Sequence, residues 1–274
     1  MFLQIIIVEV FFTRVSMIQM DMQLGKPEEN FSHAAELVRQ AAQMSPDVIT
    51  LPETWNVGFF PKENLGELSD QDCAKVKETF SALAKEYKVN IIAGSVANLR
   101  PDGKIYNTAC VFDRQGSLVT EYDKVHLFSP SGEHEYFQHG VTPCNFTLDG
   151  VPCSLVICYD IRFPELIRSE MLAGSKVQFV VAQWPDTRTL HWDTLNRARA
   201  IEGQCFLSCT NSVGTAGSVK CGGHSAIYAP MGECLILGGE AEQILTADMD
   251  LSAVEDVRNR INVYRDRIPE AYRL

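Results

Sequence analysis

The sequence predicts an α/β fold in which two mixed β-sheets pack face to face between outer helices, a four-layer αββα sandwich. Along the 274 residues, short apolar runs alternate with segments of helical periodicity. Turn signals such as Pro-Asp-Gly at residues 101–103 join some of the strands as hairpins. No repeat or low-complexity linker divides the chain, and 46% hydrophobic residues suffice for one large core.

The first half is expected to begin its core at Arg14, where a strand over residues 14–20 starts. A helix follows from Pro27 to about Met44, with acids in its first turn where the helix dipole favours them. The remaining elements predicted for this half are strands over 47–51, 90–96, 105–112 and 118–124, and a helix over about 72–88.

The second half repeats the alternation and contains one unusual junction. An apolar strand over 151–157 stops at Cys158, and Pro164 opens a helix that reaches Ala173. Further strands are predicted over 177–182, 205–210, 225–228, 233–237 and 244–248, helices over 190–203 and from 251, and an extended tail over 268–272.

Residues 1–13 differ from the rest of the chain. Residues 2–12 are apolar apart from Gln4 and Glu9, but they lack the basic start and small-residue cleavage site of a signal peptide. The run is also too short to span a bilayer. We therefore expect residues 1–13 to be an N-terminal extension of a domain formed by residues 14–274.

Charge and cysteine usage exclude several classes of protein. A net charge of −11 argues against a nucleic-acid or anionic-membrane partner, because both require a basic surface. The nine cysteines include no CxxC pair, the closest spacing being Cys205 to Cys209, which favours a reducing cytoplasm. His134 and His139 are five residues apart, but no acidic or cysteine residue repeats that spacing. No metal or other cofactor is therefore expected.

Three strands end in side chains of complementary chemistry: Glu53, Lys124 and Cys158. Taken singly, Glu53 could be solvated at the rim of a sheet, Lys124 could cover a sheet edge, and Cys158 could be a thiol packed in the core. Together, they supply a nucleophile, a base and a cation. A free thiol with a pKa of about 8.5 needs a base or a cation beside it. Glu53 can be that base, while Lys124 can stabilise a thiolate or an oxyanion.

The sequences around these residues resemble the three catalytic blocks of the nitrilase superfamily of carbon–nitrogen hydrolases. The blocks are Leu-Pro-Glu53-Thr-Trp, Tyr-Asp-Lys124-Val-His-Leu-Phe and Ile-Cys158-Tyr-Asp-Ile-Arg-Phe-Pro-Glu-Leu. The resemblance runs from about Arg14 to the C-terminus. It implies the αββα fold, a Glu-Lys-Cys triad, a carbon–nitrogen hydrolase domain over residues 14–274, and homodimers or larger assemblies of dimers.

The family also carries a second active-site glutamate shortly after the lysine. Glu133 and Glu135 both lie in that region. The spacing back from Gly140 favours Glu133.

Within the superfamily, the blocks around Lys124 and Cys158 look most like the ω-amidase branch and its bacterial relatives. That resemblance implies hydrolysis of a small carboxylate-bearing amide, such as 2-oxoglutaramate, with water and without a cofactor. N-carbamoyl amidase, nitrilase and aliphatic amidase activities remain alternatives, as does a catalytically silent binding protein. A papain-like protease, pairing Cys158 with His191 or His224, fits the Glu and Lys blocks poorly.

An anionic substrate requires a local cation in so acidic a protein. Arg188, in the loop after Trp184-Pro185, and Arg162, four residues beyond the nucleophile, are the candidates, since arginine binds a carboxylate through two hydrogen bonds. Arg162 could instead form an ion pair with Glu165 or Asp160.

Two further residues are assigned to the substrate site. The backbone N–H of Tyr159 is expected to help Lys124 hold the oxyanion, and Trp184 is expected to line the pocket. For the neighbouring pair His191-Trp192, packing within a helix and lining of the pocket are both open.

Overall fold

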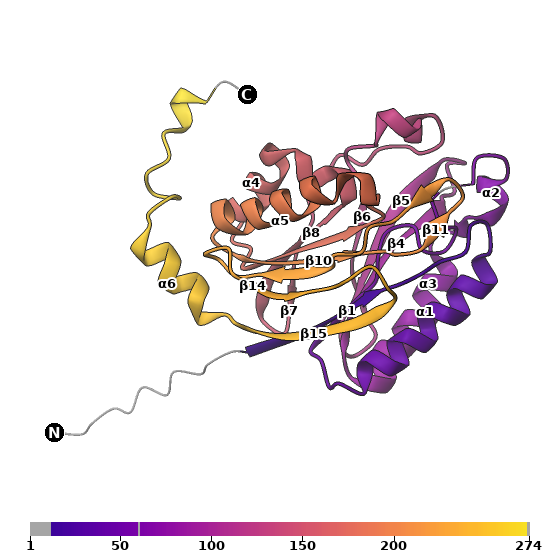
Figure 1. The fold of residues 1–274 in the computed structure, drawn as a ribbon, viewed down its shortest axis with the longest axis horizontal. Helices are drawn as coiled ribbons and strands as arrows, with labels where there is room; N and C mark the ends of the chain where they lie inside the picture. The colour runs from indigo at the N-terminus through magenta and orange to yellow at the C-terminus, as the bar shows by residue number, and fades with distance from the viewer. Residues whose placement is uncertain (1–11, 60, 273–274) are drawn as a thin grey trace.

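The computed structural model describes residues 12–59 and 61–272. Two mixed sheets pack face to face, and a pair of helices covers the outer side of each (Figure 1). This is the expected αββα sandwich, and the strands over 105–112, 151–157 and 177–182 have the predicted bounds.

The first sheet has the strand order β15-β1-β2-β4-β5-β6, with β3 paired beside β4. Strands β1, β2 and β4 are parallel, whereas β15, β5 and β6 join through antiparallel pairings. Helices α1 (Pro27–Ala42) and α3 (Ala74–Tyr87) pack on its outer face. Its strands are β1 (Phe12–Gln19), β2 (Val48–Thr50), β3 (Asp70–Gln71), β4 (Asn90–Leu99), β5 (Ile105–Phe112), β6 (Leu118–Asp123) and β15 (Gln243–Asp250).

The second sheet has the order β14-β13-β10-β9-β8-β7, with β8, β9 and β10 parallel. Helices α4 (Pro164–Leu172) and α5 (Thr189–Gly203) cover it. Its strands are β7 (Asn145–Leu148), β8 (Val151–Ile157), β9 (Val177–Ala182), β10 (Phe206–Asn211), β13 (Ala226–Tyr228) and β14 (Cys234–Leu237). Short elements between and after the sheets are α2 (Leu65–Leu68), the hairpin β11 (Thr215–Ala216) and β12 (Val219–Lys220), and α6 (Ser252–Arg260).

The main core lies between the two sheets. Val15 and Ile92 from the first sheet meet Leu155 and Phe179 from the second, and all four are buried. Full burial of such a side chain contributes roughly 1.5–3 kcal/mol. Each sheet also forms one further core with the helices that cover its outer face. This packing joins the two sheets into one layered core.

The structure corrects the sequence prediction at both ends of the chain and at one edge strand. Strand β1 begins at Phe12 rather than Arg14, because Phe12 and Thr13 pair with Asp250 and Met249. Residues 1–11 lie outside the described residues. The short edge strand β7 was not anticipated. The tail is not extended over 268–272, since residues 269–271 form one 3₁₀ turn.

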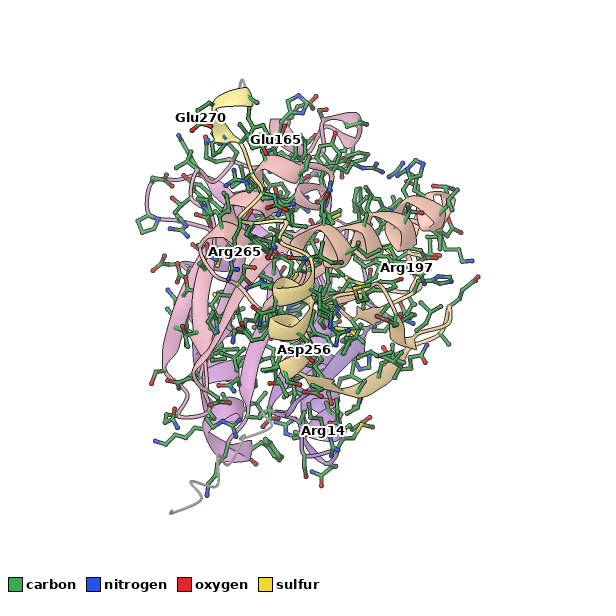
Figure 2. The ribbon with its side chains drawn as sticks, turned by 90° about the vertical axis from the view of Figure 1, so that its left-hand side faces the viewer. Arg14, Glu165, Arg197, Asp256, Arg265 and Glu270 are labelled. Atoms are coloured by element: carbon green, nitrogen blue, oxygen red, sulfur yellow. The ribbon has the colours of Figure 1, made fainter. Side chains whose placement is uncertain are left out.

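The C-terminal segment runs beside the second helical layer and contacts it at the end of α5 (Figure 1). Figure 2 shows Asp256 on α6, Arg265 further along the segment, and Glu270 near its end, close to the level of Glu165. The Tyr264 hydroxyl donates to the Gly203 carbonyl at the end of α5, which anchors this segment.

In the part of the chain that the structure describes, no helix combines the length and apolar character needed to cross a membrane.

Candidate active site

The strand ends that carry the predicted groups meet at one end of the sandwich. Strands β2 and β6 run in the same direction, since β6 is antiparallel to β5, which is antiparallel to β4. In the other sheet, β8 and β9 are parallel. The carboxyl ends of parallel strands are where open α/β folds place their ligands. Glu53, Lys124 and Cys158 leave these ends toward a single cavity.

The turn that carries Glu53 is fixed by a bulge in β4. Pro52 accepts a hydrogen bond from Ser95 N at 3.0 Å, and Thr54 N donates to Ser95 Oγ at 3.0 Å. Gly94, beside them, has φ +61°, and a Cβ there would lie 2.0 Å from the Pro52 carbonyl oxygen. Only glycine therefore allows this close approach, which holds the backbone of Glu53.

Cys158 occupies a sharp turn between strand and helix. Strand β8 ends at Ile157, Cys158 has φ +48°, and a 3₁₀ turn over Cys158–Arg162 leads to α4. A non-glycine residue in this left-handed region is strained by about 1–3 kcal/mol, a feature often found at nucleophiles on such turns. The turn presents the partly exposed Cys158 side chain at the cavity.

Lys124 lies between two carboxylates. Its Nζ is 2.8 Å from Glu53 Oε1 and 2.9 Å from both oxygens of Glu133. All three side chains are buried. Glu133 also accepts a hydrogen bond from Phe128 N, whereas Glu135 is exposed. Of the two candidates for the second glutamate, the structure places Glu133 against the lysine.

Asn107 in β5 belongs to the same cluster and was missed by the sequence reasoning. Its Nδ2 donates to Glu53 Oε1 at 2.8 Å and lies 3.4 Å from Glu133 Oε1. The second oxygen of Glu53 accepts the backbone N–H of Gln183 at 2.8 Å. The only sequence signal for Asn107 is a polar residue within an otherwise apolar strand, which has no specific meaning.

The charges of the cluster set its protonation. Burial opposes the charge of Lys124, but Glu133 and Glu53 outweigh it and raise the pKa of the lysine well above its ordinary value. Burial and then the Glu53 carboxylate raise the pKa of the Cys158 thiol, against the opposite effect of Lys124. At rest, the lysine is therefore charged and the thiol keeps its proton. Reaction at sulfur requires a base, and Glu53 is positioned to serve.

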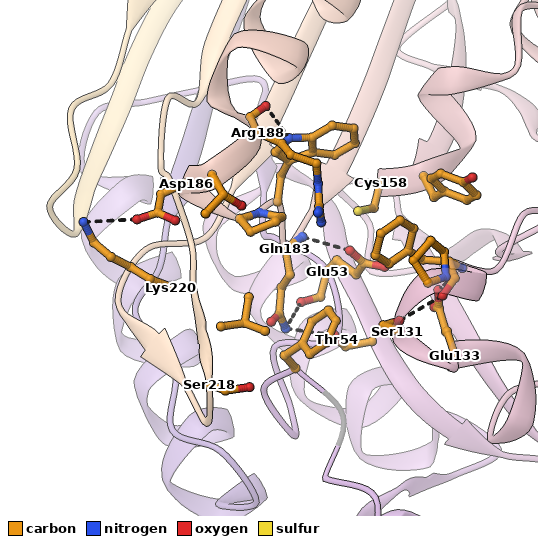
Figure 3. Close-up of a pocket in the computed structure, with 18 of the residues that line it drawn as sticks. Glu53, Thr54, Ser131, Glu133, Cys158, Gln183, Asp186, Arg188, Ser218 and Lys220 are labelled. Atoms are coloured by element: carbon orange, nitrogen blue, oxygen red, sulfur yellow. Dashed lines mark hydrogen bonds and ion pairs between the residues drawn. The ribbon is translucent and has the colours of Figure 1, made fainter.

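These groups form the floor of a cavity of about 370 Å³. Figure 3 shows Cys158, Glu53 and Glu133 gathered on one side, with Arg188 reaching toward them from a 3₁₀ turn over Asp186–Arg188. Lys220 lies at the opposite rim, where it is 3.5 Å from Asp186. The lining also contains Tyr159, Arg162 and Trp184, all expected at the substrate site.

The two arginines of the cavity wall carry uncompensated charge. Arg162 lies over the ring of Trp184 at 4.7 Å, and its Nη2 is 3.1 Å from His191 Nδ1. Arg188 lies over the ring of Phe128 at 5.0 Å. Among residues 12–59 and 61–272, neither arginine has a carboxylate within ion-pair distance. Burial and then Arg188 lower the pKa of Arg162.

The expected ion pair of Arg162 with Glu165 or Asp160 is therefore wrong. The Asp160 carboxylate is occupied by donors from Tyr122, His126 and the backbone of Ile157, and Arg162 is turned toward Trp184 instead.

Trp192 packs inside the protein rather than lining the cavity. It is 1% exposed, its Nε1 donates to the His224 carbonyl at 2.8 Å, and its ring centroid lies 5.5 Å from that of Trp184. Helix packing thus accounts for this residue. Within the described ranges, no three His, Cys, Asp or Glu side chains come together as potential metal ligands.

With this geometry established, comparison with known proteins shows that the chain belongs to the carbon–nitrogen hydrolase family, whose model matches residues 14–259. It is therefore a hydrolase of amide-type carbon–nitrogen bonds. It is 40% identical to a 2-oxoglutaramate amidase of Bacillus subtilis over 94% of this chain and 98% of the relative. It is 38% identical to a hydrolase in the agr operon of Staphylococcus aureus, over 92% and 97% of the two chains.

A solved structure gives the same result for the fold. A CN-hydrolase superfamily protein from Xanthomonas campestris superimposes with a TM-score of 0.88 at 27% identity, covering 96% of this chain and 99% of the other.

Proposed function

We propose that this enzyme hydrolyses the terminal amide of a small dicarboxylate monoamide, with 2-oxoglutaramate as the first choice, to give 2-oxoglutarate and ammonia. The observation that carries the proposal is the combination, in one cavity, of the Cys158 cluster with Arg162 and Arg188, two cations that have no carboxylate partner among the described residues. Similarity to the 2-oxoglutaramate amidase of Bacillus subtilis supports this choice.

In the proposed mechanism, Cys158 Sγ attacks the amide carbon while Glu53 takes the thiol proton. Glu53 then gives that proton to the nitrogen as the C–N bond breaks and ammonia leaves, so that a thioester remains on Cys158. Glu53 next takes a proton from water, whose oxygen attacks the thioester carbon. The C–S bond breaks, the product acid leaves, and the proton returns to sulfur. A positioned proton-transfer group contributes about 10²–10⁴-fold in rate.

We assign the binding of the oxyanion in both tetrahedral intermediates to Lys124 and the backbone N–H of Tyr159. Lys124 keeps its charge throughout, because Glu133 binds its ammonium group through both oxygens. Removal of one preorganised oxyanion donor costs roughly 10²–10³ in rate. Asn107 and Lys124 both bind Glu53 Oε1, whereas Oε2 accepts one hydrogen bond, from Gln183 N, so we assign the proton transfer to Oε2.

A panel of substrates tests the proposed function directly. Ammonia release is measured from 2-oxoglutaramate, succinamate, glutamine, a nitrile and an N-carbamoyl amino acid. The two anionic amides without an α-amino group should react best. Superior turnover of the nitrile or of the carbamoyl compound would assign another activity of the superfamily, and no turnover of any would favour a silent binding protein. Cleavage of denatured casein would indicate a protease.

We further propose a homodimer that forms through the outer faces of α4 and α5. Leu172, Leu190 and Ile201 expose 43%, 75% and 48% of their surface on these helices. Such an apolar face is typical of a protein–protein contact.

All nine cysteines are free thiols, which supports a reducing compartment such as the cytoplasm.

A further inference from the structure

The two groups that must cooperate at the substrate carbonyl come from different sheets. Lys124 follows β6 in the first sheet and Cys158 follows β8 in the second. Hydrophobic packing between sheets is non-directional, so it does not by itself fix the relative position of two strand ends. Catalysis is sensitive to misplacement on the scale of 1 Å. A directional link is needed between these two points.

Asp160 provides such a link. It is fully buried, and each of its oxygens accepts two hydrogen bonds. Oδ2 accepts from the Tyr122 hydroxyl at 2.7 Å and from Ile157 N at 3.1 Å. Oδ1 lies 2.8 Å from both His126 N and His126 Nδ1. Because a carboxylate only accepts, Nδ1 carries the ring proton.

The positions of these partners along the chain are informative. Tyr122 and His126 stand two residues before and two residues after Lys124, and Ile157 directly precedes Cys158. A single carboxylate thus connects both sides of the lysine to the start of the turn that carries the thiol. The bond to Ile157 N also closes that turn, in which Cys158 has φ +48°.

A second contact strengthens the same link. The His126 ring stacks on Phe163, with centroids 3.6 Å apart and an interplanar angle of 6°. Phe163 is the residue between the 3₁₀ turn of Cys158 and α4. Burial and then Asp160 raise the pKa of the Tyr122 phenol well above its ordinary value, so the phenol stays a donor.

We propose that Asp160 is a positioning residue, which sets the placement of Lys124 relative to Cys158 by binding Tyr122, His126 and the Ile157 backbone together. It is absent from the lining of the cavity and so acts through these groups rather than on the substrate. The proposal rests on the proposed role of Cys158 as the nucleophile.

The nearly isosteric variant Asp160→Asn tests the proposal. All of these partners donate to Asp160, so the NH₂ group of asparagine, on either side, would face a backbone N–H, of Ile157 or of His126, that then has no acceptor. We expect kcat to fall roughly 10- to 100-fold, with KM within about twofold of wild type. The rate of Cys158 alkylation by iodoacetamide, followed by mass spectrometry of the Cys158 peptide, should also change because the environment of the thiol changes.

Two further variants keep the test decisive. Tyr122→Phe removes one hydroxyl and no backbone contact, so it should fold even if Asp160→Asn does not, and kcat should fall about 3- to 10-fold. Glu170→Gln is the matched control, because Glu170 is another buried acid, on α4, that is bound to Cys144 N rather than to a catalytic strand. Its kcat should stay within about twofold of wild type.

Wild-type kcat and alkylation rate in both Asp160→Asn and Tyr122→Phe would overturn the proposal. An equal loss of kcat in Glu170→Gln and Asp160→Asn, at equal melting temperatures of the two variants, would also overturn the proposal. It would show that substitution of any buried acid lowers kcat. The alkylation readout does not require an amide substrate. It therefore separates failure of this proposal from failure of the proposed amidase function, which the substrate panel reports.

Discussion

At the scale of single residues, the cluster around Cys158 is arranged so that the first proton transfer leaves its total charge unchanged. Glu53 and Glu133 are carboxylates, Lys124 is an ammonium ion, and the thiol is neutral at rest. Transfer of the proton from sulfur to Glu53 exchanges one negative group for another. Loss of the same proton to solvent would add a third negative charge to a cluster of largely buried groups, which costs free energy.

The binding of the substrate carboxylate is expected to depend on Arg188. Arg188→Ala should raise KM for succinamate roughly 10- to 100-fold, because hydrogen bonds to charged groups contribute about 1.5–3 kcal/mol. KM for butyramide, which lacks the carboxylate, should stay unchanged. Steady-state ammonia release with the two substrates provides the comparison. Equal weakening of both would mean that Arg188 supports its loop and that the carboxylate is held elsewhere.

Glu170 is expected to make stability depend on pH. Burial raises the pKa of this carboxyl well above the ordinary 4.5, so the folded protein binds a proton that the unfolded chain releases. Its contribution to stability is present below about pH 4.5 and is lost as the pH rises toward the folded pKa. Glu170→Gln, which cannot ionise, should therefore show a smaller fall in melting temperature between pH 5 and pH 8 than wild type. An identical fall would contradict this assignment.

Residue types at strand ends were sufficient to find Glu53, Lys124 and Cys158, because their chemistry is complementary and their positions follow from strand direction. Asn107 could not be found in this way, since an amide inside a strand has no distinctive pattern. The stacking of Arg162 on Trp184 was equally inaccessible, because it joins turns that follow different strands.

At the scale of elements, periodicity predicted the strands and helices that carry a full apolar face. Strands β5, β8 and β9 have their predicted bounds, since each is mostly apolar and is preceded by a turn residue or a charge. The edge strand β7 was missed because four residues with one buried side chain are too few for a period to be visible. The extra residues of β1 were missed because their pairing partners lie in β15, more than 230 positions away.

The expected N-terminal extension can be tested by deletions that end before and within β1. Deletion of residues 1–11 leaves all of β1. It should leave the activity unchanged and should shift the melting temperature by no more than about two degrees. Deletion of residues 1–13 also removes the pairs of Phe12 with Asp250 and of Thr13 with Met249, and should lower the melting temperature further. Thermal unfolding of both variants checks this. A large loss from the shorter deletion would show that the extension contributes to the fold.

At the scale of the whole molecule, the helical layer over the second sheet exposes large apolar side chains on its outer side. Leu190 and Ile201 are eleven residues apart on α5, about three turns, and so share one face. Ile201 also lies against the turn at Gly232. Both side chains are therefore placed to take part in the proposed contact with a second copy of the chain.

Light scattering tests the proposed dimer. The wild type should give about twice 30.6 kDa, and Ile201→Asp should shift it toward the monomer by placing a charge in the contact. Val141→Asp is the control, since Val141 is 81% exposed and lies on neither α4 nor α5. A wild-type mass of 30.6 kDa at all working concentrations would contradict the dimer.

The central claim, a thioester on Cys158, is tested most directly by mass spectrometry of enzyme quenched in acid during turnover of 2-oxoglutaramate. We predict that the peptide containing Cys158 gains the mass of the acyl group, that the other eight cysteines remain unmodified, and that Cys158→Ala shows neither adduct nor ammonia release. Full ammonia release by Cys158→Ala, or an acyl adduct on a different cysteine, would contradict the account.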